Sequence, residues 1–370
     1  MTPAALHIPR VDLSAQLQAL QAELDRAIAR VLASGNYILG PEVEAFEAEF
    51  AAYCGTAQCV ATGSGTDALR LALTACGVGP RDEVITASHT AVPTAAAVRL
   101  TGAAPVLVDV DPDTYTMSPA RAAGALTPRT RALLPVHLYG QCADMDPLRR
   151  LAGERDLVLI EDACQAHGAT YRGVRAGAIG RLGCFSFYPT KNLGAYGDGG
   201  AVCTDDDELA AQLRLSRNHG LTRNYSHRTV AGNSRLDELQ AAILRAKLVY
   251  LDEWNERRRT LAALYAECLS GLPVTLPIAA DWGEHAYHLY VIRARQRDEL
   301  LVHLRENGVD AGIHYPVPVH RQPAFSDSRS DADLPVTDAL ADEVLSLPMY
   351  PELTEDQVSH VADLVRAFFG

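Results

Sequence analysis

The chain has 370 residues, 48% of them hydrophobic and 21% charged, which allows a substantial buried core and more than one domain. The formal net charge of −13 argues against a nucleic-acid binder, which needs a basic face for the phosphates. No apolar run has membrane-spanning length, no secretion signal opens the chain, and the eight cysteines are scattered without a C-x-x-C pair. We therefore expect a cytoplasmic protein with free thiols and no metal site.

Helical patterns open the chain, first over residues 15–33 and then from Pro41. From about residue 58, short apolar runs alternate with helical patterns. The runs expected to be strands cover residues 59–62, 83–88, 104–111, 132–140, 157–164, 184–189 and 199–204. Such alternation predicts an α/β fold with a largely parallel sheet covered on both faces. Few residues separate the last two strands, so we expect them to form a hairpin-like or crossed pair.

A long helical stretch over residues 234–270 is too long for one ordinary helix, and we expect it to bridge two domains. Ser234 is its expected N-cap. A smaller region of strand and helix follows. The last helix is expected to begin at Thr354, where Gln357 completes a capping box.

The stretch "CVATGSGTDALRLAL" places Gly63, Gly65 and Ala68 between a strand and a helix, close to the fingerprint of a dinucleotide site. A dinucleotide site also requires an acidic residue about 20 residues on, at the end of the next strand, to hold the ribose. The next strand is followed by "HTA", which has no carboxylate. A glycine turn at a helix N-terminus, with the hydroxyls of Ser64 and Thr66, suits a single phosphate instead.

A lone lysine, Lys191, follows an apolar strand in "FSFYPTKNLGAYGDGGAV" and precedes four glycines. Glycines let a ligand approach the backbone closely. A desolvated lysine has a lowered pKa and can act as a Schiff-base nucleophile. The segment therefore indicates a catalytic lysine beside a ligand.

Upstream of this lysine, a buried strand ends on Glu161 and Asp162, at the edge where open α/β sheets bind their ligands. An acid there can cap a helix, bind a metal or pair with a protonated ring nitrogen. His167 is the only soft metal ligand nearby, so a metal is the less favoured alternative. A Schiff-base lysine with an acid for the ring nitrogen is the pattern of pyridoxal 5′-phosphate (PLP) enzymes.

Nine segments together resemble one family in its own order: "YILGPEVEAFE", "GSGTDAL", "VDVDPDTYTM", "PVHLYGQCADMDP", "IEDACQAHGA", "FSFYPTKNLGAYGDGGAV", "NSRLDELQAAIL", "GIHYPVPVH" and "LPMYP". Over nearly its whole length the chain resembles the DegT/DnrJ/StrS family of PLP-dependent nucleotide-sugar aminotransferases. The resemblance implies the fold-type-I aminotransferase architecture. A large PLP-binding domain over residues 1–245 would carry a seven-stranded, mostly parallel sheet, and a smaller C-terminal α/β domain would cover residues 246–370. The enzyme would be a homodimer with shared active sites.

The resemblance also implies roles at the cofactor ring. Lys191 would form the Schiff base and act as general acid and base for the proton shift. Asp162 would pair with the pyridine nitrogen, and Gln165 would bond the phenolic oxygen of the ring. Most relatives stack an aromatic residue on the ring where this chain has Ala91, so His89 is the expected cofactor contact there.

Further residues match positions that hold the phosphate or the substrate in the family. Those expected to hold the phosphate are Gly65, Thr66, Ser186 and, from the partner subunit, Asn233. Those expected to contact the substrate are Tyr188, Arg235, His314 and Tyr315.

The reaction implied by the resemblance is transamination of a nucleotide-linked keto-sugar with L-glutamate as the amino donor. A dTDP-linked 3-keto-6-deoxyhexose is the expected substrate, in deoxyamino-sugar or polysaccharide biosynthesis. A UDP-linked 3-keto or 4-keto acetamido sugar is the alternative. Other possibilities are a sugar dehydratase, whose members carry histidine in place of Lys191, a regulator that keeps the fold, and a nicotinamide-dependent sugar oxidoreductase.

Overall fold

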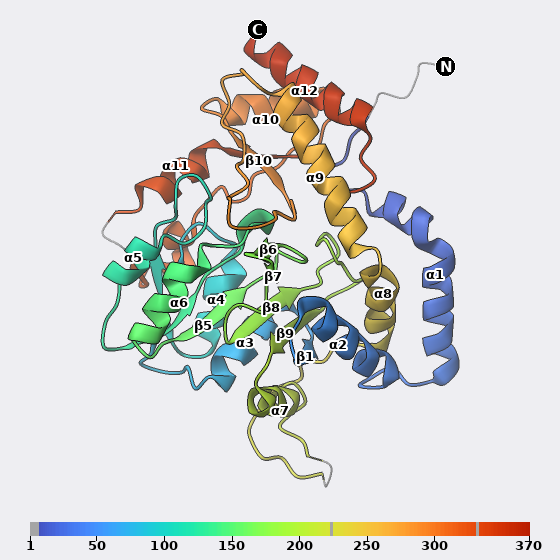
Figure 1. Cartoon of the computed structure of the whole chain (residues 1–370), viewed down its shortest axis with the longest axis vertical. Helices are drawn as coiled ribbons and strands as arrows, with labels where there is room; N and C mark the ends of the chain where they lie inside the picture. Colours follow the sequence, from blue (N-terminus) through green and yellow to red (C-terminus); the bar gives the residue numbers. More distant parts are fainter. Residues whose placement is uncertain (1–6, 223–224, 331–332) are drawn as a thin grey trace.

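The computed structural model describes residues 7–222, 225–330 and 333–370, and an eight-stranded sheet lies at its centre (Figure 1). In spatial order the strands are β1 (Gln58–Thr62), β9 (Gly200–Thr204), β8 (Leu182–Ser186), β5 (Val158–Asp162), β4 (Thr130–Leu134), β2 (Glu83–Ala87), β3 (Ala104–Val108) and β11 (Arg329–Ser330). Neighbours are parallel except at β9, which runs antiparallel to β1 and β8. The fold-type-I prediction is confirmed, and β11 adds an eighth, two-residue strand to the seven expected.

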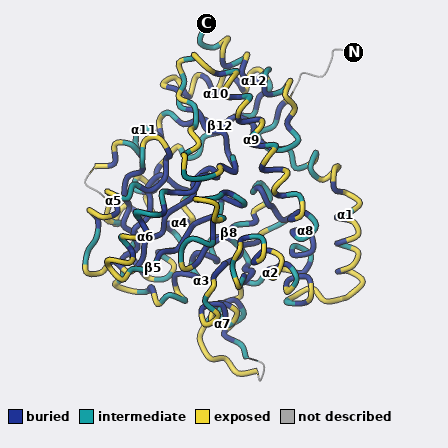
Figure 2. Tube along the Cα trace, viewed as in Figure 1, coloured by how far each residue is buried: buried dark blue, intermediate teal, exposed yellow. Residues whose placement is uncertain are grey.

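Alternate residues of the strands enter two hydrophobic cores, one on each face of the sheet. In β8, Cys184 belongs to one core and Phe185 to the other. The helices of the first core are α3 (Gly65–Ala75), α4 (Val92–Leu100) and α7 (Asp207–Ser216). Those of the second include α2 (Pro41–Cys54), α5 (Pro119–Gly124) and α6 (Met145–Glu154). Buried residues follow the strands, whereas the outer side of α1 (Leu13–Ser34) and residues 225–230 in the loop beyond α7 are exposed (Figure 2).

The long helical stretch is split into α8 (Glu238–Leu248) and α9 (Leu251–Cys268). Its N-cap position is Asp237, so the expectation that Ser234 caps this helix is wrong. The hydroxyl of Ser234 instead accepts a hydrogen bond from the backbone N–H of Gly63, at 3.1 Å. A tertiary contact with the glycine turn has taken the place of the local cap.

The first residue of α8, Glu238, is buried and caps a different helix. Its carboxylate accepts hydrogen bonds from the backbone N–H groups of Gly40, Glu42 and Val43, at 2.9, 3.0 and 2.8 Å. These groups belong to the start of α2, which has no side-chain cap of its own. One carboxylate therefore satisfies several of the free N–H groups at this N-terminus and ties α2 to α8.

The C-terminal part of the chain has its own hydrophobic core. Around it lie α9, β10 (Tyr290–Arg293), α10 (Arg297–Glu306), β12 (Val344–Leu347) and α12 (Glu355–Phe369), with β10 and β12 antiparallel. The capping box of Thr354 and Gln357 at the start of α12 is confirmed. The remaining short elements are β6 (Thr170–Tyr171), β7 (Val174–Arg175), η1 (Leu138–Gly140), η2 (Val319–Arg321), η3 (Pro323–Phe325) and α11 (Pro335–Glu343).

The expected domain boundary at residues 245 and 246 lies inside α8. Two segments cross this boundary. Ile8, near the N-terminus, packs in the C-terminal core, and β11, from the C-terminal part of the chain, pairs with β3 of the large sheet. The division into two domains at this boundary stays a prediction. None of the helices in the described ranges has both the length and the apolarity that crossing a bilayer requires.

Candidate active site

A cavity of about 240 Å³ lies where the parallel strands end at their carboxyl termini, the edge at which open α/β sheets bind ligands. It is formed by the segments that follow β1, β2, β4, β5 and β8. Its lining residues are Ser64, Gly65, Thr66, Leu69, Thr90, Ala91, Pro93, Thr94, Val136, Asp162, Cys164, Gln165, Ser186, Tyr188, Lys191 and Asp198. The structure thus brings together the expected lysine, acid and amide and three of the expected phosphate-binding residues, Gly65, Thr66 and Ser186.

The glycine turn forms one end of this cavity. Helix α3 begins at Gly65, and the side chain of Ser64 accepts a hydrogen bond from the backbone N–H of Asp67. The N–H groups of the first helical turn have no carbonyl partner within the helix, which makes this end an anion site. A Cβ atom on Gly65 would lie 2.6 Å from Cβ of Ser186. The glycine therefore permits Ser186 to approach the helix end.

Asp162 and Glu161, adjacent on β5, have separate tasks because successive side chains of a strand point to opposite faces. The buried Glu161 contacts Nε2 of His137, at 2.9 Å, and accepts hydrogen bonds from the backbone N–H groups of Gly177, Ile179 and Gly180. Its role is to anchor this loop. Asp162 lines the cavity, so of these two acids it is the one available to a ligand.

Lys191 follows β8 in a tightly packed loop. Burial lowers the pKa of its amine, so more of it is neutral near pH 7 than for an exposed lysine. The next residue, Asn192, is buried and donates hydrogen bonds to Oδ1 of Asn255 and to the carbonyl of Ala286, at 2.8 and 2.9 Å. The backbone that carries Lys191 is thereby fixed to α9 and to the segment before β10.

Tyr139, which the sequence reasoning did not select, joins several of the expected site residues. Its backbone N–H donates to Oε1 of Gln165, at 2.8 Å, and Nε2 of Gln165 donates to the hydroxyl of Tyr315, at 2.9 Å. One hydrogen on Nε2 of Gln165 remains for a ligand in the cavity. Tyr139 lies in "PVHLYGQCADMDP", and the only signal for it was its place in that matched segment.

The structure does not place His89 among the residues that line the cavity. Its ring is 1% exposed and its Nε2 contacts the hydroxyl of Tyr139, at 2.8 Å. The Tyr139 hydroxyl donates to the carbonyl of His314, so it accepts from His89. Burial lowers the pKa of His89 to about 4, which keeps the ring neutral. Ala91 and its neighbours line the cavity instead, because His89 turns away toward Tyr139.

The expected substrate residues take different places. Tyr188 lines the cavity and is 54% exposed, at the mouth where a substrate would enter. Tyr315 lies behind Gln165, and burial raises its pKa to about 12. Nδ1 of His314 contacts the hydroxyl of Ser346, at 2.8 Å, and burial lowers the pKa of His314 to about 4. Their roles toward a substrate stay predictions.

Asn233 and Arg235 lie outside the cavity of their own chain. Asn233 is exposed, and Nη1 of Arg235 donates to Oδ1 of Asn218, at 3.0 Å. Between them, the bond from Gly63 to Ser234 holds this segment beside the glycine turn. A contact from Asn233 to the phosphate in a partner subunit stays a prediction.

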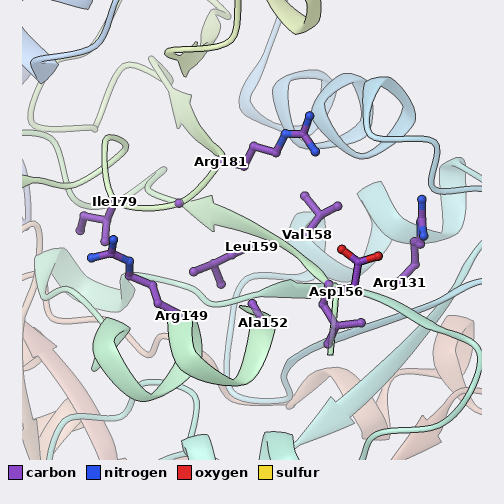
Figure 3. A pocket seen from close by; sticks show the side chains of 10 residues that line it. Arg131, Arg149, Ala152, Asp156, Val158, Leu159, Ile179 and Arg181 are labelled. Carbon is purple, nitrogen blue, oxygen red and sulfur yellow. The ribbon is translucent and has the colours of Figure 1, made fainter. Parts of the chain in front are cut away.

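A second hollow, of about 310 Å³, lies at the opposite edge of the sheet (Figure 3). Exposed arginines surround it: Arg131 and Arg181 lie near the amino ends of β4 and β8, and Arg149 lies on α6. No lysine lines it, so it lacks a group that can form a Schiff base. The candidate active site is therefore the cavity around Lys191.

The groups around Lys191 match the parts of PLP. The cleft at Gly65 offers N–H groups and hydroxyls to the phosphate, Asp162 offers an acceptor to the ring nitrogen, and Gln165 offers a donor to the phenolic oxygen. Lys191, with its lowered pKa, offers the amine. Fold and cavity together define a PLP-dependent aminotransferase of fold type I.

The chain belongs to the DegT/DnrJ/EryC1/StrS aminotransferase family, whose model matches residues 18–366. A dTDP-3-amino-3,4,6-trideoxy-alpha-D-glucose transaminase of Streptomyces venezuelae is 54% identical over 361 residues, which cover 97% of this chain and 95% of that protein. A UDP-N-acetyl-3-dehydro-alpha-D-glucosamine 3-aminotransferase of Acidithiobacillus ferrooxidans is 46% identical over 359 residues, or 97% of each chain. The crystal structure of S. venezuelae DesV in complex with a ketimine intermediate matches with a TM-score of 0.96 at 53% identity and covers 98% of both chains.

Proposed function

We propose that the enzyme transfers an amino group from L-glutamate to the keto group of a dTDP-linked 3-keto-6-deoxyhexose, acting as a homodimer in the cytoplasm. The single observation that carries the chemistry is the convergence of Lys191, Asp162 and Gln165 on one cavity beside a phosphate cradle. The choice of sugar is supported by the 54% identity to a transaminase named for a dTDP-linked amino sugar.

PLP, when bound, supplies an electron sink that stabilises a carbanion next to the transferred nitrogen. The chain's own groups position the reactants and move protons. Nζ of Lys191 takes the proton from one carbon and returns it to another, and its lowered pKa makes a neutral amine available. Asp162 would accept the hydrogen of the ring nitrogen and so keep that nitrogen protonated. Gln165 would donate a hydrogen bond to the phenolic oxygen of the ring.

The first test is spectroscopic. The protein incubated with PLP should gain a yellow band near ~420 nm that borohydride fixes and bleaches, a property of the lysine-bound cofactor. Lys191→Ala should not form the band, should keep no PLP covalently attached after borohydride treatment, and should not turn over glutamate. Lys247→Ala is unsuitable as a control because Lys247 is buried against the carbonyl of Gly194. The matched control is the unaltered protein loaded with PLP but not treated with borohydride, from which denaturation should release the cofactor. A protein that never takes up PLP would contradict the proposal.

The second test decides the substrate. Glutamate and a panel of dTDP- and UDP-linked keto-sugars would be assayed for 2-oxoglutarate release. A UDP-linked acetamido sugar is the second candidate, because a relative named for such a sugar is 46% identical over 97% of this chain. If only UDP-linked sugars were turned over, a UDP-linked sugar would replace the dTDP-linked sugar as the proposed substrate. If neither class were turned over, both proposed substrates would be rejected.

A further inference from the structure

Thr94, a buried residue in the first turn of α4, contacts the candidate ring-nitrogen acid directly. Its hydroxyl donates to Oδ2 of Asp162 at 2.7 Å. Both side chains line the cavity, and Thr94 is 2% exposed. The contact joins two elements, α4 and the end of β5, that are distant in the sequence. It is a bond to an acidic side chain away from bulk water, where a hydrogen bond counts for more than at the surface.

A second threonine, Thr90, forms a hydrogen bond with Thr94, and its donor can be assigned. Oγ1 of Thr90 lies 3.1 Å from Oγ1 of Thr94. A hydroxyl has one hydrogen, and that of Thr94 is committed to Asp162, so Thr94 accepts and Thr90 donates. The resulting chain runs from Thr90 through Thr94 to Asp162.

The other oxygen of Asp162 is also held. The backbone N–H of Cys164 donates to Oδ1 at 3.2 Å. Two bonds from two directions fix the rotation of the carboxyl group, and its remaining lone pairs are left for a ligand in the cavity. If Thr94 gave no hydrogen, only the longer bond from Cys164 would oppose rotation.

We propose that Thr94 is a positioning residue that aims the carboxylate of Asp162 at the ring nitrogen of PLP, and that Thr90 orients the hydroxyl of Thr94. The proposal rests on the proposed role of Asp162. It assigns the effect to the hydroxyl rather than to packing, because valine would fill the same volume without donating a hydrogen.

The experiment compares two ligands of the apoprotein. One is PLP, and the other is its analogue with CH in place of the ring nitrogen. Their dissociation constants would be measured by absorbance titration for the unaltered chain and for Thr94→Val, Thr94→Ser and Thr90→Val. A misplaced carboxylate weakens only the ligand that has the nitrogen, so the ratio of the two constants is the readout.

We expect the unaltered protein to prefer PLP over the analogue, and Thr94→Val to reduce that preference about tenfold, the effect of one hydrogen bond to a charged group. Thr94→Ser keeps the hydroxyl and should keep the preference. Thr90→Val leaves the bond to Asp162 in place and should reduce the preference about two- to threefold, within the range of a weak hydrogen bond. Where Thr94→Val does not give folded apoprotein, Thr94→Ala removes the same hydroxyl without adding bulk.

Two results would overturn the proposal, and they differ. If Thr94→Val or Thr94→Ala weakened both ligands equally, the residue would act through packing, and the role of Asp162 would stand. If the unaltered protein bound both ligands equally well, Asp162 would not serve the ring nitrogen, and the assignment on which the proposal rests would fail with it.

Discussion

Gly65→Ala tests the argument that the phosphate cradle depends on the absence of one side chain. The added Cβ would lie 2.6 Å from Cβ and 3.1 Å from Cα of Ser186, and 3.0 Å from Sγ of Cys164. Because two of these atoms are at or next to the backbone, relief requires a shift of β8 or of α3. Overpacking of this kind costs about 1–3 kcal/mol. The better helix propensity of alanine offsets about 1 kcal/mol of it.

We therefore expect Gly65→Ala to lower the free energy of unfolding by up to about 2 kcal/mol, which is the cost of overpacking less the gain in helix propensity. The shift would also separate Ser186 from the first-turn N–H groups of α3, so affinity for PLP should fall about tenfold. Urea unfolding of the apoprotein and absorbance titration with PLP measure the two effects.

The matched control is Gly153→Ala in α6, where an added Cβ would meet no atom within 4 Å. That variant should be as stable as the unaltered protein or more stable by up to about 1 kcal/mol, with the same affinity for PLP. If Gly65→Ala behaved like this control in both measurements, the steric account of the cradle would be refuted.

Three further predictions concern the scaffold. Glu238→Gln leaves one acceptor oxygen for the three N–H groups at the start of α2 and should cost about 2–3 kcal/mol in urea unfolding; unchanged stability would show that the cap is dispensable. Tyr139→Phe removes the hydroxyl between His89 and the carbonyl of His314 and should cost about 1–3 kcal/mol, whereas a loss confined to PLP binding would speak against a structural role. Burial lowers the pKa of His167 to about 3, so its contribution to stability is complete above about pH 6.5 and falls toward pH 3, by up to about 1.4 kcal/mol per pH unit. In His167→Leu the dependence of unfolding on pH should lose the slope of one proton, and an identical slope would contradict the assignment.

Much of the fold could be predicted because its signals are local. Alternating apolar runs and helical patterns predicted the seven main strands, Pro41 marked the start of α2, and Thr354 with Gln357 marked the start of α12. The prediction that Ser234 caps the helical stretch was wrong, because the hydroxyl of Ser234 accepts a hydrogen bond from Gly63 instead of capping α8. A contact across 171 residues is invisible to a search for nearby caps.

The sequence predicted those residues of the site whose side chains have a distinctive chemistry. Asp162 ends β5 and Lys191 follows β8, and parallel strands bring their carboxyl ends to one edge, so the meeting of these two residues could be inferred from the sequence. His89 was selected for its type and position, but the turn after β2 directs its ring to Tyr139. Side-chain direction after a strand depends on the backbone angles of the turn, which the sequence does not report.

The sequence by itself determined the family, the sheet, the candidate catalytic lysine and the kind of anion that the glycine turn suits. The family follows from the resemblance of nine segments, and the others follow from residue type and spacing, which are properties of the chain alone. Only the tertiary structure decided which hydroxyl reaches Asp162, that Glu238 caps a helix far from it in sequence, and that Gly65 lies against Ser186. The physical reason is that hydrogen bonds and steric contacts depend on distances of a few ångströms between elements, and those distances exist only once the elements have packed.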